Sequence, residues 1–304
     1  MTYASVCHSF RNFSVTLFAY VQKLLYFCSM KRIFTQIFVW LGIMAVLTLV
    51  AAGLWYAVLG NDQSTVGLKW LQLFQTVCTF LLPPICCAWI WDADHKPFRL
   101  LQMDRGADWK LFLLAIGIMI CAIPAINLLA DLNSHVDLPE WLDSIEQKLK
   151  AYEDEAAALI ERFLQADNSW QVLLNIGLMA LLPALAEELS FRGTLQQILG
   201  NKHIAIWVTA IVFSAIHMQF YGFIPRMLMG AMFGYVFVWS GCLWIPIVMH
   251  FTNNSLAVIA YYIFGSENSY ADTIGAGATW WLGVLSLILT SLGLLIFYRR
   301  THTR

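Results

Sequence analysis

Five ionisable residues lie in apolar stretches of the chain that are otherwise suited to cross a bilayer. Glu187, Glu188 and Arg192 share one stretch, and His217 and His250 lie in two later ones. An ionisable side chain in hydrocarbon costs at least about 2.5–3.5 kcal/mol on insertion scales. Keeping five of them there is most simply explained by chemistry, in which a carboxylate and imidazoles exchange protons with a substrate.

The two glutamates are expected to have different tasks. Neighbours on a helix point about 100° apart, so Glu187 and Glu188 cannot serve the same site in the same way. Glu188 and Arg192 are spaced i, i+4 and are expected to form an ion pair. Glu187 has no such partner within its helix, which makes it the candidate general base. Pro183 removes one helix hydrogen bond a turn earlier, and the resulting kink would open room for water beside Glu187.

The two histidines recur with a second residue one helical turn away. Phe213 precedes His217 by four residues, and Asn254 follows His250 by four. The Asn254 amide is a donor suited to a developing oxyanion. Counting 1.5 Å per residue from the nearest turns places Glu187 and His217 about 20 Å deep and His250 about 14 Å deep on the same side. We therefore expect the three side chains to meet at one level of a helix bundle.

Three motifs thus occur in order on separate predicted helices: EExxxR at 187–192, FxxxH at 213–217 and HxxxN at 250–254. Together they resemble the CAAX-protease and bacteriocin-processing family of intramembrane glutamic endopeptidases, which includes the Ras-converting CAAX protease. The motifs cover about 70 residues and show no departure from the family pattern. The surrounding region from 171 to 264 is the expected catalytic core.

The resemblance implies roles for these residues. Glu187 with His217 would activate a water that attacks the scissile carbonyl, and His250 with Asn254 would hold the oxyanion. The substrate would be a peptide or protein within or at the membrane.

The remaining motif residues are interpreted as supporting ones. A structural ion pair is the favoured interpretation of Glu188 and Arg192, and Phe213 is expected to pack against or shape the cavity. For Asn254, hydrogen bonding between helices is the alternative to a catalytic role.

Composition places the chain in a membrane. It has 304 residues, of which 60% are hydrophobic and only 12% charged, against roughly 25% charged in soluble domains. The formal net charge of −1 argues against a nucleic-acid partner, which requires a basic face. The seven cysteines show no CxxC and no metal-finger spacing, so neither a disulfide framework nor a structural zinc site is indicated.

The predicted fold is an all-α, polytopic membrane bundle of about eight transmembrane helices with an extramembrane amphipathic helical segment. Runs of about 20 apolar residues mark the spans. They are expected at 35–60, 67–91, 111–130, 171–189, 204–220, 223–240, 243–264 and 279–298.

Lysines and arginines in the short loops set the orientation. With eight spans they fall on one side, which should be the cytoplasm. Arg226 is the exception. We therefore expect a multi-pass protein of a bacterial inner membrane with both termini in the cytoplasm.

Two segments are set apart from the membrane spans, and the single transmembrane domain is predicted to span 31–304. Residues 1–30 are either an amphipathic helix or a stretch translated from too early a start, because Met30 precedes two basic residues. The segment 131–169 holds ten Asp or Glu residues and is expected on the non-cytoplasmic side. Its apolar side chains recur at helical spacing, which indicates a helix that either gates the core or rests on the bundle surface.

Three other functions use the same residues. Glu187, His217 and His250 would make a three-ligand zinc site with an open position, although no HExxH is present and the favoured mechanism has no cofactor. A transporter also places carboxylates and histidines in the membrane, but no internal repeat is found. The third alternative is a non-catalytic membrane scaffold that binds partners through the same polar cavity.

Overall fold

The structure is a computed structural model that describes residues 3–60, 62, 64–136, 139–200, 203–265 and 273–303. Side chains are described from Met30 onward, with the exception of Leu59.

The described residues form helices and no strands, which confirms the predicted all-α class. The first half of the chain forms α1 (Tyr3–Leu59), α2 (Thr65–Thr76), η1 (Val77–Leu81), α3 (Leu82–Trp91), α4 (Pro97–Leu100), α5 (Trp109–Ser134), η2 (Glu140–Leu142) and α6 (Asp143–Leu164). The second half forms α7 (Ser169–Asn175), η3 (Ile176–Leu181), α8 (Leu182–Ser190), η4 (Phe191–Gln196), α9 (Gln197–Leu199), α10 (His203–Ala215), α11 (Phe223–Ser240), α12 (Trp244–Phe264), η5 (Gly277–Thr279) and α14 (Trp280–His302).

Seven helical segments among the described residues are long and apolar enough to cross a membrane, so the protein is a multi-pass membrane protein. The predicted span at 204–220 is wrong in length. Its helix, α10, ends at Ala215 after 13 residues, which is about 20 Å against a hydrocarbon thickness of about 30 Å. Gly222 and Pro225 stand in the way of a longer helix, and the chain turns before α11 begins at Phe223.

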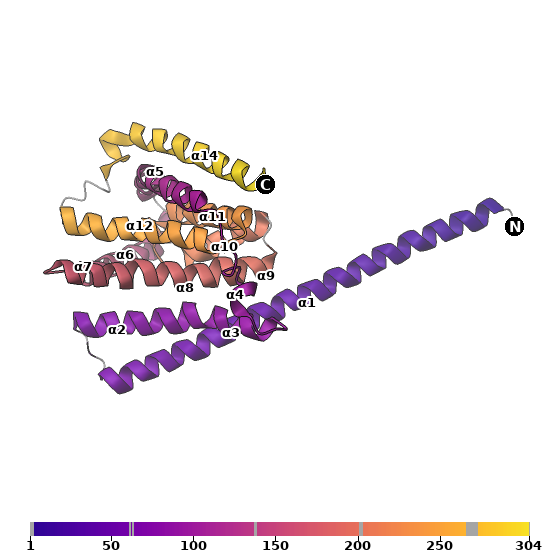
Figure 1. The fold of residues 1–304 in the computed structure, drawn as a ribbon, viewed down its shortest axis with the longest axis horizontal. Coiled ribbons are helices and arrows are strands. Elements are labelled where there is room, and N and C mark those ends of the chain that lie inside the picture. Colours follow the sequence, from indigo (N-terminus) through magenta and orange to yellow (C-terminus); the bar gives the residue numbers. More distant parts are fainter. Residues whose placement is uncertain are drawn as a thin grey trace.

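The helices lie in a stack that surrounds the candidate site. α14 packs on α5, α10 packs on α11, and α12 packs on α5 and on the helical segment that begins at Ser169. Figure 1 shows these helices side by side, with α2 and α3 on the opposite side from α14. It also shows the end of α14 and the free part of α1 at the same end of the bundle. Many apolar side chains on the outside are exposed, such as Phe38, Leu49 and Ile204, as lipid-facing positions require.

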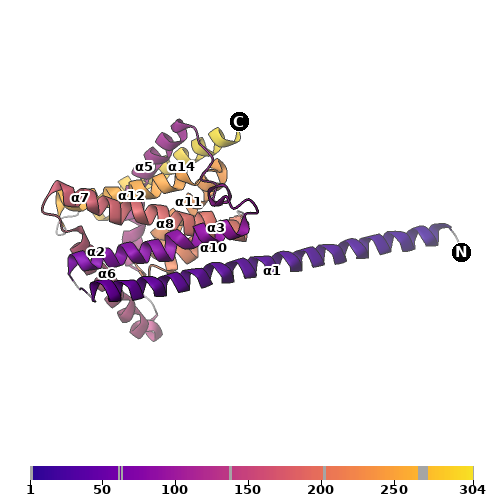
Figure 2. The ribbon, with the colours of Figure 1, turned by 60° about the horizontal axis from the view of Figure 1, so that its bottom comes forward.

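The first helix continues without interruption through residue 30. α1 runs from Tyr3 to Leu59, so the proposed boundary between 1–30 and 31–304 lies inside a helix. Its second half packs on α2, η1 and α3, and its first half extends alone away from the bundle (Figure 2). The amphipathic character predicted for 1–30 concerns side chains that lie outside the described ones.

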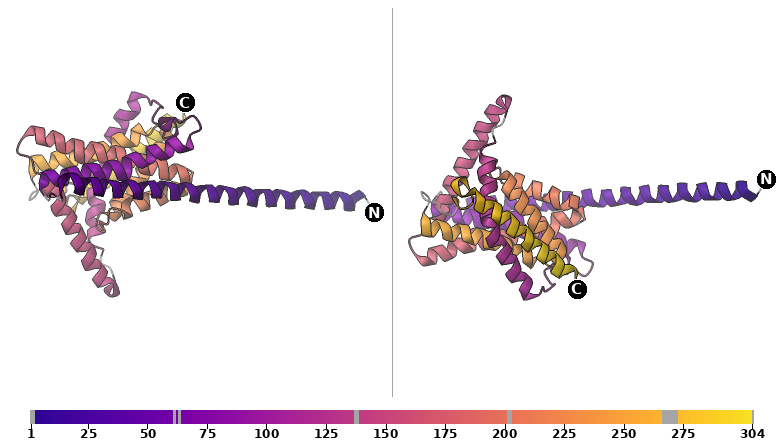
Figure 3. Two further views of the ribbon diagram at one scale, coloured as in Figure 1. Left: turned by 90° about the horizontal axis from the view of Figure 1, so that it is seen from below. Right: turned by 90° about the horizontal axis from the view of Figure 1, so that it is seen from above.

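The predicted helix in 131–169 is α6, and it leans away from the bundle (Figure 3). Phe163 at its C-terminal end is buried, whereas Trp141 just before it and Tyr152 in its middle are 79% and 54% exposed. The predicted apolar stripe is therefore buried at Phe163 and only partly covered along the rest of the helix, where Leu149 and Ala156 are half-buried.

The stretch from Ser169 to Leu199 that carries the glutamates is one helical segment of 31 residues. It contains two π-helical stretches, η3 before and η4 after the α-helical turns that hold the glutamates. Pro183 is accommodated at the start of α8, directly after η3. π-Helical turns are uncommon and occur frequently at functional sites.

Side chains of α5, α6 and α10 fix the turn between α10 and α11. Asn133 of α5 donates to the carbonyl of Phe220 at 2.9 Å, and Ser214 donates to the carbonyl of Phe223 at 2.7 Å. Glu153 of α6 accepts the backbone N–H of Tyr221 at 3.3 Å. Because irregular backbone at membrane depth needs protein partners for its polar groups, these contacts allow the chain to turn here.

Candidate active site

A fully buried ion pair lies at the centre of the site. Arg192 Nη1 donates to Glu188 Oε1 at 2.7 Å, and neither side chain is exposed to solvent. Arg192 Nη2 donates to the carbonyl of Gly230 on α11 at 2.8 Å. The guanidinium lies 4.8 Å from the ring centre of Phe213 and 5.4 Å from that of Phe233, which are cation–π distances. The i, i+4 pairing predicted from the sequence is confirmed.

His250 lies between the two glutamates. Its Nδ1 is 2.9 Å from Glu188 Oε1, and its Nε2 is 3.9 Å from Glu187 Oε2. An ionised carboxylate can only accept, so Nδ1 carries the hydrogen and Nε2 is the atom presented to Glu187. The ring stacks on Phe233 at 5.4 Å. Glu188 thus fixes the orientation of His250, in the manner of carboxylates that orient histidines in other sites.

Glu187 differs from Glu188 as the sequence predicts. Its side chain keeps 17% of its surface exposed, and its carboxylate makes no hydrogen bond to the described residues. The 3.9 Å to His250 Nε2 is too long for a direct hydrogen bond and suits a third group held between the two. Glu187 is therefore the carboxylate of this site that is free to act on a bound molecule.

His217 does not lie on the helix that the sequence predicts. It lies two residues beyond the end of α10, in the turn before α11. Its Nδ1 is 2.7 Å from the carbonyl of Phe213, so Nδ1 donates and Nε2 is left for other partners. Phe213 packs against His217 as expected, with the two rings edge to face and their centres 5.0 Å apart.

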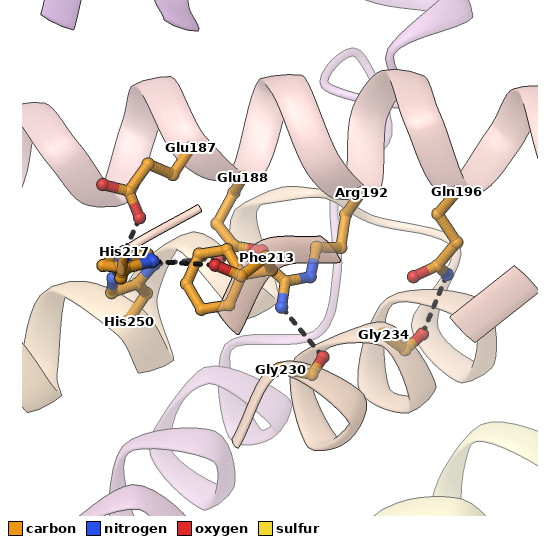
Figure 4. A network of polar contacts seen from close by, with 9 residues as sticks. All are labelled: Glu187, Glu188, Arg192, Gln196, Phe213, His217, Gly230, Gly234 and His250. Atoms are coloured by element: carbon orange, nitrogen blue, oxygen red, sulfur yellow. Dashed lines mark hydrogen bonds and ion pairs between the residues drawn. The ribbon is translucent and has the colours of Figure 1, made fainter. Parts of the chain in front are cut away.

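Phe213 joins the two histidines. Its ring centre is 5.0 Å from that of His217 and 6.0 Å from that of His250. Figure 4 shows Glu187 and both histidines on one side of Phe213 and Arg192 on the other. The predicted convergence of one carboxylate and two imidazoles from three elements is therefore present in the structure.

Asn254 is not joined to this group by a hydrogen bond among the described residues. It is half-buried on α12, one turn beyond His250. Its Oδ1 accepts from Asn253 Nδ2 at 3.2 Å. The predicted oxyanion role of Asn254 stays a prediction.

The zinc alternative gains no geometric support. Among the described residues, no three His, Cys, Asp or Glu side chains are grouped to hold a metal ion.

Arg226 is a site residue that the sequence reasoning missed. In the sequence it is an exception to the charge pattern of the loops, and in the structure it is half-buried in the first turn of α11. Its Nη2 donates to Gln219 Oε1, and it interacts electrostatically with Glu153 and Glu187. The sequence signal for its inward position is the glycine four residues earlier. The Arg226 guanidinium packs over Gly222, where a Cβ would lie 2.9 Å from Nη2.

A pair of glycines on α11 was also missed. A Cβ at Gly230 would lie 3.3 Å from both Arg192 Nη2 and Phe213 Cδ1, and one at Gly234 would lie 2.7 Å from Gln196 Oε1. The two glycines are spaced i, i+4, which is the GxxxG pattern of closely packed membrane helices. This spacing was visible in the sequence and lets α11 approach the ion pair.

Comparison with known proteins identifies this region. Residues 169–256, from the start of α7 into α12, match the family model described as type II CAAX prenyl endopeptidase Rce1-like. This segment is similar to Rce1-like domains. It contains all three motifs, and the match confirms the resemblance drawn from them.

The chain is also similar to the uncharacterized protein YpbD of Bacillus subtilis (strain 168). The two are 33% identical over 81 residues, which is 25% of this chain and 40% of YpbD. The chain thus spans about two fifths of the length of that relative. No solved structure matches the chain significantly.

Proposed function

We propose that the protein is an intramembrane endopeptidase that hydrolyses a peptide bond of a membrane-associated protein or peptide without a metal. The observation that carries this proposal is the Glu187 carboxylate, which faces His250 Nε2 at 3.9 Å while Glu188 holds the other side of the ring. The Rce1-like match supports it, because that description names an endopeptidase.

In this mechanism Glu187, with His217 beside it, takes a proton from a water whose oxygen bonds to the scissile carbonyl carbon. His250 carries a proton on both nitrogens. Its Nδ1–H donates to Glu188, and its Nε2–H, with the Asn254 amide, stabilises the oxyanion. The C–N bond then breaks, and the proton on Glu187 passes to the leaving amine nitrogen. The products are a carboxylic acid and an amine.

The charges of the buried groups balance in this state. Glu153, Glu187 and Glu188 are negative, and Arg192, Arg226 and the protonated His250 are positive, with Arg226 interacting with both Glu153 and Glu187. A neutral cluster avoids the large cost of an unpaired charge in a low-dielectric site. The ion pair therefore supports the mechanism by orienting His250 and by compensating its charge.

The loops that carry the basic residues define the orientation that we propose. Arg299 and Arg300 close α14 at the same bundle end as α4 and the loop that follows it (Figure 1). We place this end in the cytoplasm and α6 on the opposite side, by the positive-inside rule.

The test is comparative proteomics of membrane peptides in cells that express the parent or the Glu187→Gln variant. A new carboxyl terminus is expected with the parent, and its yield should fall by about 10²–10⁴-fold when the general base is removed. The matched control is Glu155→Gln, which removes the same charge from the exposed surface of α6. Equal cleavage by parent and Glu187→Gln would refute the proposal and would favour the scaffold alternative.

A further inference from the structure

A cavity of about 1030 Å³ lies between α5, α6 and α12. Such a volume is at the upper end of the range for small-molecule sites and is large enough for several residues of a peptide. None of the residues that form the ion pair or the Glu187–His250 contact lines it. The cavity is therefore a separate feature beside the candidate active site.

The walls of the cavity have opposite chemistry. α5 and α12 contribute apolar side chains, among them Ile120, Ile123 and Leu256. α6 contributes all the carboxylates, among them Asp154 and Glu161, beside apolar side chains such as Ile160, and no lysine or arginine is among the lining residues. Apolar side chains from α5 and α12 opposite carboxylates from α6 are complementary to an apolar peptide that carries a positive charge on one side.

One end of the cavity reaches the active site. Gln219 and Asn253 both line it. Gln219 follows His217 by two residues in the same turn, and Asn253 donates to its neighbour Asn254. A chain lying in the cavity would therefore reach the histidines and Glu187 by extending past these two amides.

α6 is joined to the turn that carries His217. The backbone N–H of Tyr221 donates to Glu153, and its hydroxyl donates to Glu146, each at 3.3 Å. Lys150 pairs with Glu146 at 2.8 Å, and this hydrogen bond raises the pKa of Lys150. Glu146 is thus neutralised within α6, whereas Asp154 and Glu161 have no ion pair among the described residues.

We propose that this cavity binds the substrate peptide, and that the substrate is an apolar segment with a lysine or arginine placed against the α6 wall. This inference rests on the proposed function and deepens it, because it names the substrate class. The acidic wall disfavours an anionic lipid headgroup, so a cationic peptide is the occupant that the charges favour.

Binding is measured apart from hydrolysis in the full chain carrying Glu187→Ala, reconstituted in nanodiscs of zwitterionic lipid. The probes are two dansyl-labelled peptides with the same apolar segment of leucine and alanine, one flanked by lysines and the other by glutamates. Energy transfer from the protein's tryptophans reports binding, and empty nanodiscs correct for partition into lipid.

We expect the lysine peptide to bind about tenfold more tightly than the glutamate peptide. The double variant Asp154→Asn, Glu161→Gln should weaken the lysine peptide about fivefold and leave the glutamate peptide unchanged or tighter. Glu155→Gln, on α6 but outside the cavity lining, is the control and should change neither. Ala257→Trp fills the cavity from an exposed position of α12 and should weaken both peptides.

Equal affinity of the two peptides, or an equal effect of Glu155→Gln and the double variant, would overturn the charge preference. Undiminished binding in Ala257→Trp would overturn the cavity as the binding site and leave the lipid as the location of the peptide. A thermal unfolding scan of each variant confirms that it is folded. The two ideas can be told apart. If the peptides bind as described but the parent protein cleaves no membrane peptide, the binding inference holds and the proposed function fails.

Discussion

Replacing Arg192 alone by methionine should destabilise the protein far more than replacing Arg192 and its partner Glu188 together by neutral residues. In the Arg192→Met variant Glu188 stays buried without its arginine and keeps only His250 as a partner, and breaking a buried ion pair in this way costs about 3–5 kcal/mol. The carbonyl of Gly230 also loses its donor, which costs about 1–3 kcal/mol for a buried polar group. Because such terms are not additive, we expect the free energy of unfolding to fall by about 4–6 kcal/mol.

The double variant Glu188→Gln, Arg192→Met removes both charges and keeps an oxygen that accepts from His250 Nδ1. Replacing both members of a buried pair by neutral groups of similar size is often neutral in stability. The double variant should therefore be more stable than Arg192→Met by about 2–4 kcal/mol.

The assay is equilibrium unfolding of the purified protein in mixed micelles, with the parent and both single variants completing a double-mutant cycle. A coupling energy below about 0.5 kcal/mol, as for independent sites, would refute the reasoning. So would a loss of less than about 1 kcal/mol in Arg192→Met, because that is the level of a surface ion pair.

Three other outcomes are expected. Gly234→Ala should lower the free energy of unfolding by about 1–3 kcal/mol, because its Cβ would meet two neighbours at 2.7 and 2.8 Å. Gly117→Ala, with nothing within 4 Å of its Cβ, should not destabilise the protein in the same equilibrium unfolding assay. Arg226→Gln should lower kcat about tenfold or more, which is about 1.4 kcal/mol in the activation barrier, because it removes a cation that interacts with Glu187. Arg226→Lys should keep most of the activity. Equal losses of the two variants in a peptidase assay would indicate that Arg226 acts through packing rather than charge. Treatment with EDTA should leave cleavage unchanged, and a loss restored by zinc would support the metal-dependent alternative.

The ion pair and the convergence of the site could be predicted because they depend on local spacing. Glu188 and Arg192 are one turn apart, so their pairing needs only the helix. The depths of Glu187 and His250 follow from counting helical residues from the turns at the bundle end, whereas His217 lies two residues beyond the end of its helix. Both features depend only on distance along a helix, and the sequence gives this distance directly.

The features that were missed depend on contacts between distant segments. The end of α10 at Ala215 is set by a turn whose backbone groups are satisfied by Asn133 and Glu153, which lie far away in the sequence. Arg226 could be placed at the site only once that turn was known. Likewise, the contact between Glu188 and His250 joins residues 62 positions apart, and periodicity gives no information about such a pair.

The π-helical stretches η3 and η4 on either side of the glutamates make the length of this segment critical. Removing one residue from an α-helix rotates everything beyond it by about 100°. A deletion within Ile176–Leu181 would therefore turn both carboxylates away from the histidines, unless the π-turns absorb it by reverting to α-helical geometry. Natural variants of this protein should tolerate substitutions in these stretches more readily than a change in their number of residues.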